Sequence, residues 1–389
     1  MEENVKRRKY KTMKKLAIIG ASYLQDPLIQ RAKQMGIETH VFAWAAGDVG
    51  EKSADFFYPI SITEKEKILQ ECIRIGIDGI CSISSDLAVV TVNYVSEKMG
   101  LVGNDSSCTV VSTNKHEMRR RFEEMGDPSP KSTLIENIED LKLLSFEYPV
   151  IVKPTDRSGS RGITKVESPE KLGVAVAEAF EQGFEKKVLI EEYVDGEEYS
   201  VEYISWEGMH QFLALTKKYT TKPPRFIEIG HVQPAPVSAE TLERVKAVVS
   251  HALDSLSIKY GASHSEVKIL PDESIKIIEI GGRMGGDFIG SDLVKLSTGV
   301  DFIKAVIDVS LGIKPGVYSR KLEQIAGVRF VMNGNDEDIV NSVDELEGVT
   351  VIASELYGNS DAEVTDSSNR HGYFIFTAEN YHSIEKIFE

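Results

Sequence analysis

The sequence predicts an α/β protein with more than one domain, and three observations support this. The chain has 389 residues, which is too long for one ordinary hydrophobic core and suggests two or three domains. Short apolar runs alternate with helical patterns over residues 1–111, which is typical of an open parallel sheet. Contents of 41% hydrophobic and 27% charged residues are those of a soluble globular protein.

Composition also excludes several classes of function. A net charge of −16 argues against general binding to nucleic acid or to anionic membranes, since that affinity comes from Lys and Arg. Cys72, Cys81 and Cys108 lack CxxC spacing, so they are expected to be buried thiols in a reducing compartment. The basic N-terminus lacks a convincing signal-peptide apolar region, and no apolar run approaches the roughly 20 residues that span a bilayer. We therefore expect a cytoplasmic protein.

Residues 1–111 are predicted to form an N-terminal α/β domain. Strands are expected at Leu16–Gly20, Thr39–Trp44, Gly79–Ile83 and Leu101–Gly103, with helices between them. Open parallel sheets bind ligands beyond the carboxyl ends of their strands, here near Gly20–Ser22 and Ser84–Asp86. The dinucleotide fingerprint GxGxxG is absent after the first strand, so the domain is expected to lend one wall to a neighbouring site.

Residues 112–200 contain four weak signals of ligand binding, three for an anion and one for a base edge. Lys115 lies in the first turn of a charged helix, where cations are disfavoured unless an anion or water is near. Lys153 ends the apolar strand Pro149–Pro154, and an unpartnered charge there would be costly. The loop 156–163 is an ordinary mobile hairpin or a cradle of N–H groups and hydroxyls for phosphate. The segment Val188–Glu198 enters an acidic turn that can present main-chain groups to a base edge.

A β-hairpin is predicted from two apolar-rich runs, Glu266–Leu270 and Ile275–Ile280, with its turn at Pro271–Ser274. If Leu270 pairs with Ile275, then Lys268 faces Ile277 and Glu266 faces Glu279. Side chains directly opposite in an antiparallel pair lie roughly 4.5–5.5 Å apart, and like charges placed so are destabilising. The two glutamates are either solvated on a surface hairpin or hold a hard divalent cation between them, Mg²⁺ above all.

A glycine-rich loop, Gly281–Gly286, follows this hairpin and contains Arg283. Its flexible backbone can approach an anion closely, and Arg283 can form a forked contact with phosphate or carboxylate. Upstream, Lys217 and Lys218 are predicted to lie in a polar loop, Thr216–Pro224.

Glu228 and His231 are predicted to lie close together, where either can recognise a substrate ammonium or transfer a proton. A lone histidine near a turn is more often structural, so both alternatives stay open. Further on, the patterns predict amphipathic helices over 239–256 and 293–311. A small mixed tail follows, with a strand at 326–332 and a helix at 336–343, and its role is expected to be mainly structural.

Taken in order, these pieces resemble the ATP-grasp superfamily, and within it the L-amino-acid ligases that join two amino acids into a dipeptide. The resemblance covers roughly residues 15–389 and depends on the order and spacing of weak motifs. It implies an ATP-grasp fold with an N-terminal parallel α/β domain and a mobile ATP-lid subdomain. The implied boundaries are 1–111 for the N-terminal domain, 112–195 for the lid subdomain, and 196–389 for the core with a small C-terminal subdomain.

The resemblance also implies residue roles. Lys115 and Lys153 would hold ATP phosphates, and Lys218 would reach the γ-phosphate. Glu266 and Glu279 would bind one or two Mg²⁺ ions, with Mn²⁺ as an alternative. The other nucleotide contacts would come from Ser158, Gly159, Ser160 and Gly162 in the lid loop, from Glu191, Glu192 and Val194 at the adenine, and from Glu198 at the ribose. Catalysis would rest on Arg283, Lys218 and His264, and the substrate would meet Glu228, His231, Arg283, Gly285 and Gly286.

Two positions depart from the family pattern. Many relatives carry Asn two residues after the second metal carboxylate, where this chain has Gly281, and the D-alanine ligases carry Arg where this chain has His264. The implied activity is ATP-dependent ligation of an amino acid to an amine, with release of ADP and phosphate. The alternatives are a ligase for a non-amino-acid carboxylate and a nucleotide-binding regulatory protein without turnover. The expected partners are small molecules, and a homodimer is implied only by the resemblance.

Overall fold

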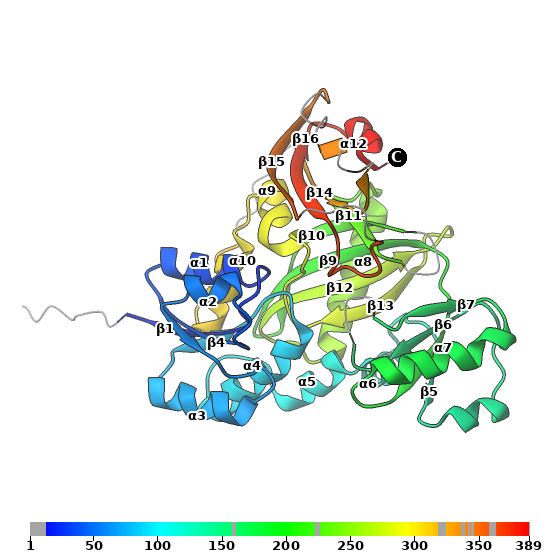
Figure 1. Ribbon diagram of the computed structural model, residues 1–389, viewed down its shortest axis with the longest axis horizontal. Coiled ribbons are helices and arrows are strands. Elements are labelled where there is room, and N and C mark those ends of the chain that lie inside the picture. The colour runs from blue at the N-terminus through cyan, green and yellow to red at the C-terminus, as the bar shows by residue number, and fades with distance from the viewer. Residues whose placement is uncertain are drawn as a thin grey trace, which may run out of the picture.

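Three β-sheets follow one another along the chain in the computed structural model of the protein (Figure 1). The structure describes residues 13–157, 161–221, 226–317, 324–334, 336, 339–340, 343, 346–357 and 363–388. Across these ranges, no helix is long and apolar enough to cross a membrane.

The first sheet confirms the predicted open parallel arrangement. Its strands are β1 (Lys15–Ile19), β2 (Glu38–Phe42), β3 (Phe56–Tyr58) and β4 (Gly79–Cys81), in the order β3-β2-β1-β4 with every neighbouring pair parallel. The helices of this region are α1 (Asp26–Gln34), α2 (Val49–Ser53), α3 (Lys65–Ile75), α4 (Asp86–Met99) and α5 (Ser106–Thr113). The three cysteines are buried free thiols, as predicted, and burial raises the pKa of each to about 12.

The second sheet is small and antiparallel. It consists of β5 (Ser132–Ile135), β6 (Val150–Pro154), β7 (Thr164–Val166) and β8 (Val188–Glu192), in the order β5-β8-β6-β7. A 3₁₀ segment, η1 (Ile138–Leu143), follows β5, and α7 (Pro169–Gln182) buries Val176 and Ala179 in the same core as Val152. Before this sheet, α6 (Lys115–Met125) begins at Asn114, whose side chain accepts hydrogen bonds from two free N–H groups of the first turn.

The third sheet has eight antiparallel strands in the order β13-β12-β9-β10-β11-β14-β16-β15. These are β9 (Glu197–Trp206), β10 (Met209–Thr220), β11 (Glu228–Gln233), β12 (Gly261–Ile269), β13 (Ile275–Gly281), β14 (Ile325–Val331), β15 (Val349–Leu356) and β16 (Gly372–Ala378). Helix α8 (Ala239–Ser255) buries Val245, Val249 and Ala252, which share one helical face. Near the C-terminus, α12 (Tyr381–Phe388) buries Ile384 and Ile387 in a separate core.

Three predictions of secondary structure were wrong. No strand forms at Leu101–Gly103, where the chain turns between α4 and α5. Lys217 and Lys218 lie in β10 and not in a loop, because β10 pairs with β9 and β11 and extends to Thr220. The helix predicted over 293–311 is broken into a π-helical turn, η2 (Ile289–Leu293), and the helices α9 (Val294–Thr298) and α10 (Phe302–Ser310). The break occurs because Gly299 adopts a left-handed conformation with φ of 74° and Asp301 caps α10. The helix predicted over 336–343 lies partly outside the described residues.

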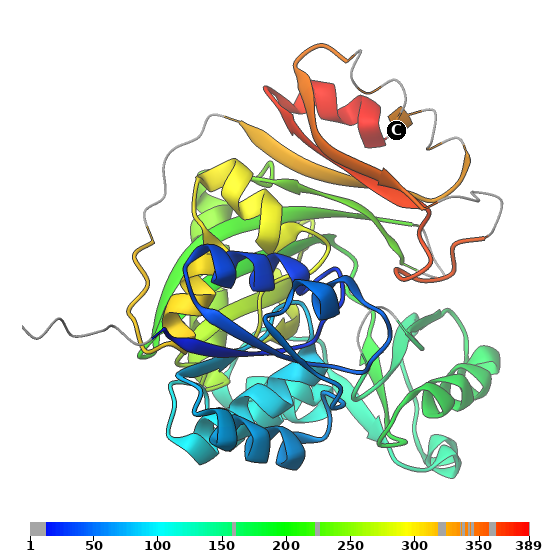
Figure 2. The ribbon, with the colours of Figure 1, turned by 60° about the vertical axis from the view of Figure 1, so that its left-hand side comes forward.

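The first and third sheets share one hydrophobic core. Leu16 and Ile18 of β1 belong to the same buried cluster as Ile204 of β9 and Val306 of α10. In Figure 2 the strands β14–β16 lie above the β5–β8 sheet, with the N-terminal sheet beside both. This packing holds the carboxyl end of β4 against the eight-stranded sheet. The domain boundaries at residues 111 and 195 stay a prediction.

Candidate active site

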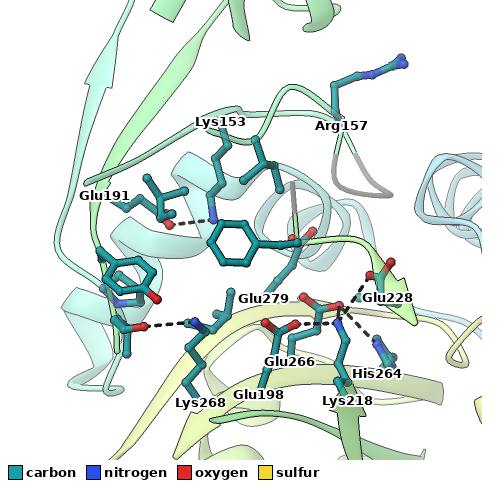
Figure 3. Close-up of a pocket in the computed structure, with 18 of the residues that line it drawn as sticks. Lys153, Arg157, Glu191, Glu198, Lys218, Glu228, His264, Glu266, Lys268 and Glu279 are labelled. Carbon is teal, nitrogen blue, oxygen red and sulfur yellow. Dashed lines mark hydrogen bonds and ion pairs between the residues drawn. The ribbon is translucent and has the colours of Figure 1, made fainter. Parts of the chain in front are cut away.

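A cavity lies between the β5–β8 sheet and strands β9–β13 (Figure 3). It is lined by the predicted nucleotide and metal residues Lys153, Glu191, Glu192, Val194, Glu198, Lys218, Glu266 and Glu279, and by Arg283. In Figure 3 the side chains of Glu198, Lys218 and Glu266 point toward one another, and Lys153 and Glu191 face them from the other sheet. The structure thus brings together residues that are far apart in the sequence.

The hairpin β12–β13 places Glu266 directly opposite Glu279, as predicted. The register nearer the turn was wrong by one residue: Ile269, and not Leu270, pairs with Ile275, and Lys268 faces Lys276. A β-bulge at Ile278 inserts one residue into β13 and restores the predicted alignment. The opposed pair is therefore confirmed, because the bulge cancels the error at the turn.

Lysines from other elements neutralise these two carboxylates. Lys115 Nζ lies 2.6 Å from Glu279 Oε1, and Lys218 Nζ lies 2.9 Å from Glu266 Oε1 and 2.7 Å from Glu198 Oε1. Burial opposes ionisation of both partners, but Lys218 holds the pKa of Glu266 well below its ordinary value. The same carboxylates raise the pKa of Lys218 well above its ordinary value. Both groups are therefore charged at neutral pH.

A second ion-pair cluster lies wholly inside the protein and involves a residue that the sequence analysis missed. Glu191 accepts hydrogen bonds from Lys153 at 2.7 Å and from Arg119 at 2.8 Å, and all three side chains are at most 4% exposed. Burial opposes the charge on Glu191, but Arg119 and Lys153 lower its pKa. Arg119 lies one helical turn after Lys115 on the buried face of α6. That spacing was the available sequence signal.

Both carboxylate oxygens of Glu191 accept hydrogen bonds in this structure, one from Lys153 and one from Arg119. The adenine contact of Glu191 stays a prediction. At the same end of the cavity the Val194 carbonyl accepts a hydrogen bond from Lys268 at 3.1 Å. Glu192 is 3.5 Å from Lys276.

Three residues of the predicted lid loop, Ser158, Gly159 and Ser160, lie outside the described residues. Gly162 is described and has φ of 70°, a conformation that favours glycine. Arg157, before the gap, points away from the other labelled side chains in Figure 3 and lies over the Phe184 ring, with its guanidinium carbon 4.4 Å from the ring centre.

A second cavity adjoins the first and shares Lys218, Glu228 and Arg283 with it. Glu228 and His231 both line it, which confirms that they lie near one another. Arg370, from the segment before β16, donates to Glu228 at 3.1 Å and to Asp287 at 2.9 Å. Its guanidinium carbon lies 3.7 Å from the centre of the Phe330 ring.

The contact between Arg370 and Asp287 was not predicted, because the two residues come from segments far apart in the chain. Burial opposes the charge on Asp287, but Arg370 holds its pKa well below the ordinary value. Burial lowers the pKa of His231, whose Nε2 is 3.5 Å from Asp287. His231 is therefore neutral at physiological pH, and two carboxylates share one buried guanidinium.

His264 lies between two carboxylates at the junction of the cavities. Its Nδ1 forms a short hydrogen bond with the fully buried Glu202, and its Nε2 is 3.7 Å from Glu266. Burial disfavours the imidazolium, but Glu202 outweighs burial and raises the pKa of His264 to about 9. At neutral pH this side chain is therefore a cation and not a general base.

The glycine-rich loop differs in part from the expectation. Gly285 N–H donates to Glu202 at 3.0 Å, so this group is not directed at a substrate, whereas Gly286 lines the second cavity. A Cβ atom at Gly285 would lie 2.7 Å from Glu202 Oε1. Arg283 lines both cavities. Its Nε and Nη2 donate to the two oxygens of Asp86, each at 2.8 Å.

Comparisons with known proteins agree with this geometry. Residues 146–292 match the family described as ATP-grasp domain. The alanine–anticapsin ligase of Bacillus subtilis is 24% identical over 300 residues, which is 67% of this chain and 62% of that protein. A D-alanine–D-alanine ligase of Coprothermobacter proteolyticus is 28% identical over 225 residues, which is 54% of this chain and 69% of that protein. The chain thus spans about three fifths of the alanine–anticapsin ligase that it matches.

Solved structures show the same fold. The L-amino acid ligase of Bacillus licheniformis aligns with a TM-score of 0.80 at 21% identity and 96% coverage of both chains. The phosphoribosylglycinamide synthetase of Anaerococcus prevotii aligns with a TM-score of 0.75 at 20% identity, again over 96% of both chains. Residues 146–292 thus match an ATP-grasp domain, and the chain as a whole shares its fold with an L-amino acid ligase and is similar in sequence to amino-acid ligases.

Proposed function

We propose that the chain is an ATP-dependent carboxylate–amine ligase that activates an amino acid and joins it to an amine, most simply a second amino acid. The observation that carries this proposal is the opposed pair Glu266 and Glu279 beside three buried lysines. The ligases among its relatives support it.

The residues at the hairpin fit a magnesium ion. Mg²⁺ is usually held by one or two protein carboxylates together with substrate phosphates and water, and Glu266 and Glu279 supply two. Across the described ranges, no group of three or more His, Cys, Asp or Glu side chains is placed to hold a metal by itself. Lysine ammonium groups now neutralise both carboxylates. When bound, the metal would neutralise charge on the ATP phosphates.

Binding of the nucleotide is proposed to change the partners of the lysines. Lys115, Lys153 and Lys218 each hold a carboxylate in the free protein, and their ammonium groups can turn to phosphate oxygens within the same cavity. Phosphoryl transfer needs in-line positioning and charge neutralisation more than covalent help from the protein. These lysines, with Arg283 at the junction of the two cavities, are placed to supply both.

The second cavity is proposed to receive the amino acid. Once Lys218 contacts phosphate, Glu228 and Asp287 share only the guanidinium of Arg370. One negative charge is then left without a partner, and a substrate ammonium would balance it. His231 is neutral here because burial lowers its pKa. A zwitterionic amino acid therefore suits this cavity better than a simple carboxylate.

The proposed reaction has two steps. A substrate carboxylate oxygen attacks the γ-phosphorus, which gives an acyl phosphate and releases ADP. The second substrate's amine then attacks the acyl carbon, phosphate leaves, and the amine nitrogen loses a proton. His264 is assigned to orienting Glu266, because an imidazolium held by Glu202 does not accept the proton.

The test measures ADP formation with single amino acids and with pairs of them. The proposal expects turnover that depends on a pair, and transfer of ¹⁸O from the labelled carboxylate of one substrate into phosphate. Glu279→Gln is expected to lower turnover by a factor on the order of 10³, whereas Asp272→Asn at the exposed tip of the same hairpin is the matched control. Turnover without ¹⁸O transfer would overturn the acyl phosphate.

A further inference from the structure

The loop after β4 contacts the glycine-rich loop at several points. Ser84 N–H donates to the Met284 carbonyl at 3.2 Å, and Ser84 Oγ donates to the Gly285 carbonyl at 3.4 Å. Asp86, the first residue of α4, accepts both hydrogen bonds from Arg283. The N-terminal sheet therefore holds the loop that carries Arg283, across almost 200 positions of sequence.

Asp86 also occupies the space that a side chain at position 281 would need. A Cβ atom built on Gly281 would lie 2.6 Å from Asp86 Oδ1 and 3.0 Å from Arg283 Nε. Gly281 is not among the residues with positive φ, so its backbone conformation does not require glycine. Glycine is required instead because the Asp86 carboxylate lies too close for a side chain at this position. This accounts for glycine at a position where many members of the family that the chain resembles carry Asn.

The two bonds to Asp86 determine which part of Arg283 faces a ligand. Nε and one N–H of Nη2 are used by Asp86, and Nη1 has only a long contact of 3.5 Å with the Met284 carbonyl. A bidentate contact fixes the plane of a guanidinium as well as its position. The end of Arg283 formed by Nη1 and the second N–H of Nη2 is therefore left for an anion where the two cavities meet.

We propose that Asp86 is a positioning residue that aims the Nη1–Nη2 end of Arg283 at the acyl phosphate, and that position 281 must be glycine to admit the Asp86 carboxylate. This inference rests on the proposed ligase function. It gives the N-terminal domain a role in positioning Arg283 in the active site. Asp86 touches no reacting atom in this scheme and acts only through Arg283.

The first test separates positioning from folding. Asp86→Ala and Asp86→Asn are expected to lower kcat for ADP formation at least tenfold, with the Kd for MgATP, measured by calorimetry, changed less than twofold. Glu66→Gln, an exposed acidic residue in the first turn of α3, is the matched control. In an Arg283→Met background, Asp86→Asn is expected to cause no further loss. Independent, multiplying losses would overturn the proposal.

The second test uses the space between the two residues and needs no turnover. Gly281→Ala is expected to lower the melting temperature by several degrees in the natural chain and by much less when Asp86→Ala is also present. An equal loss in both backgrounds would overturn the steric part. Failure to form ADP with any substrate would instead overturn the ligase function, because the melting-temperature coupling would remain.

Discussion

The two ends of the active-site cavities hold their carboxylates in different ways. At the nucleotide end, lysines from separate elements hold them, with Lys115 at 2.6 Å from Glu279 and Lys153 at 2.7 Å from Glu191. At the substrate end, Glu228 and Asp287 share the single guanidinium of Arg370. Lysine ammonium groups on flexible stems can exchange partners, whereas Arg370 is 7% exposed and stacked on Phe330.

The difference separates two tasks. The nucleotide end is neutral before ligand arrives, so phosphates and metal can enter by replacing ion pairs that already exist. The substrate end gains one unbalanced negative charge when Lys218 leaves Glu228, and that charge would select a cation. The predictions below test this contrast, from the largest expected effect to the smallest.

Removal of one metal carboxylate should have opposite effects on two measurements. Glu279→Gln is expected to lower magnesium-dependent ADP formation by a factor on the order of 10³, because metal charge stabilisation is worth several kcal/mol. The same change frees Lys115 from its ion pair, so metal-free ATP is expected to bind tighter, as measured by calorimetry. Weaker binding of metal-free ATP in this variant would contradict the exchange of partners.

The buried cluster of Glu191, Lys153 and Arg119 is expected to contribute strongly to the free energy of unfolding. Glu191→Gln leaves Lys153 and Arg119 as uncompensated buried cations, and breaking a buried pair costs about 3–5 kcal/mol. The pKa of Glu191 is lowered in the folded state. Its contribution is therefore complete above the ordinary value of about 4.5 and is lost as the pH falls through the lower folded value.

Chemical denaturation from pH 7 to pH 3 would check both parts. The natural chain is expected to lose stability below about pH 4.5, and the Glu191→Gln variant is expected to start lower and to lose less over the same range. Parallel curves for the two proteins would show that this carboxylate does not contribute to acid sensitivity.

At the substrate end, Asp287→Asn is expected to weaken selection for an ammonium group. Hydrogen bonds to charged groups contribute about 1.5–3 kcal/mol, which corresponds to roughly 10- to 100-fold in kcat/KM. The measurement compares an amino acid with its 2-hydroxy analogue, and the preference for the amino acid is expected to fall by that factor. An unchanged preference would place the ammonium elsewhere.

The contrast also explains what could be predicted from sequence. Glu266 and Glu279 lie on one hairpin, so a register counted from the turn predicted that they would face each other, and the bulge at Ile278 offset the one-residue error at Ile275. A bulge depends on tertiary packing, and nothing in the local pattern marked Ile278 as the extra residue.

The substrate end could not be predicted in the same way. Arg370 reaches Glu228 across 142 positions, and Asp86 reaches Arg283 across 197. Such contacts depend on how sheets pack against each other, which no local period encodes.

Lys218 was placed in a loop because its segment is polar, but pairing on both sides extends β10 beyond it. Tertiary hydrogen bonding overrode local composition there.

The smallest effect on the free energy of unfolding is expected for Arg120→Ala, because Arg120 is the exposed neighbour of the buried Arg119. Arg119 and Arg120 are adjacent on α6, but Arg120 is 56% exposed and pairs with Glu117 and Glu124 at the surface. Exposed pairs contribute about 0–1 kcal/mol, because water screens them and ordering two long side chains costs entropy. Arg120→Ala is therefore expected to change the free energy of unfolding by less than about 0.5 kcal/mol, and Arg119→Ala by several times more. Since both changes remove one guanidinium from the same helix, equal losses in urea denaturation would mean that helix propensity, and not the buried contact with Glu191, sets the stability of this end of the site.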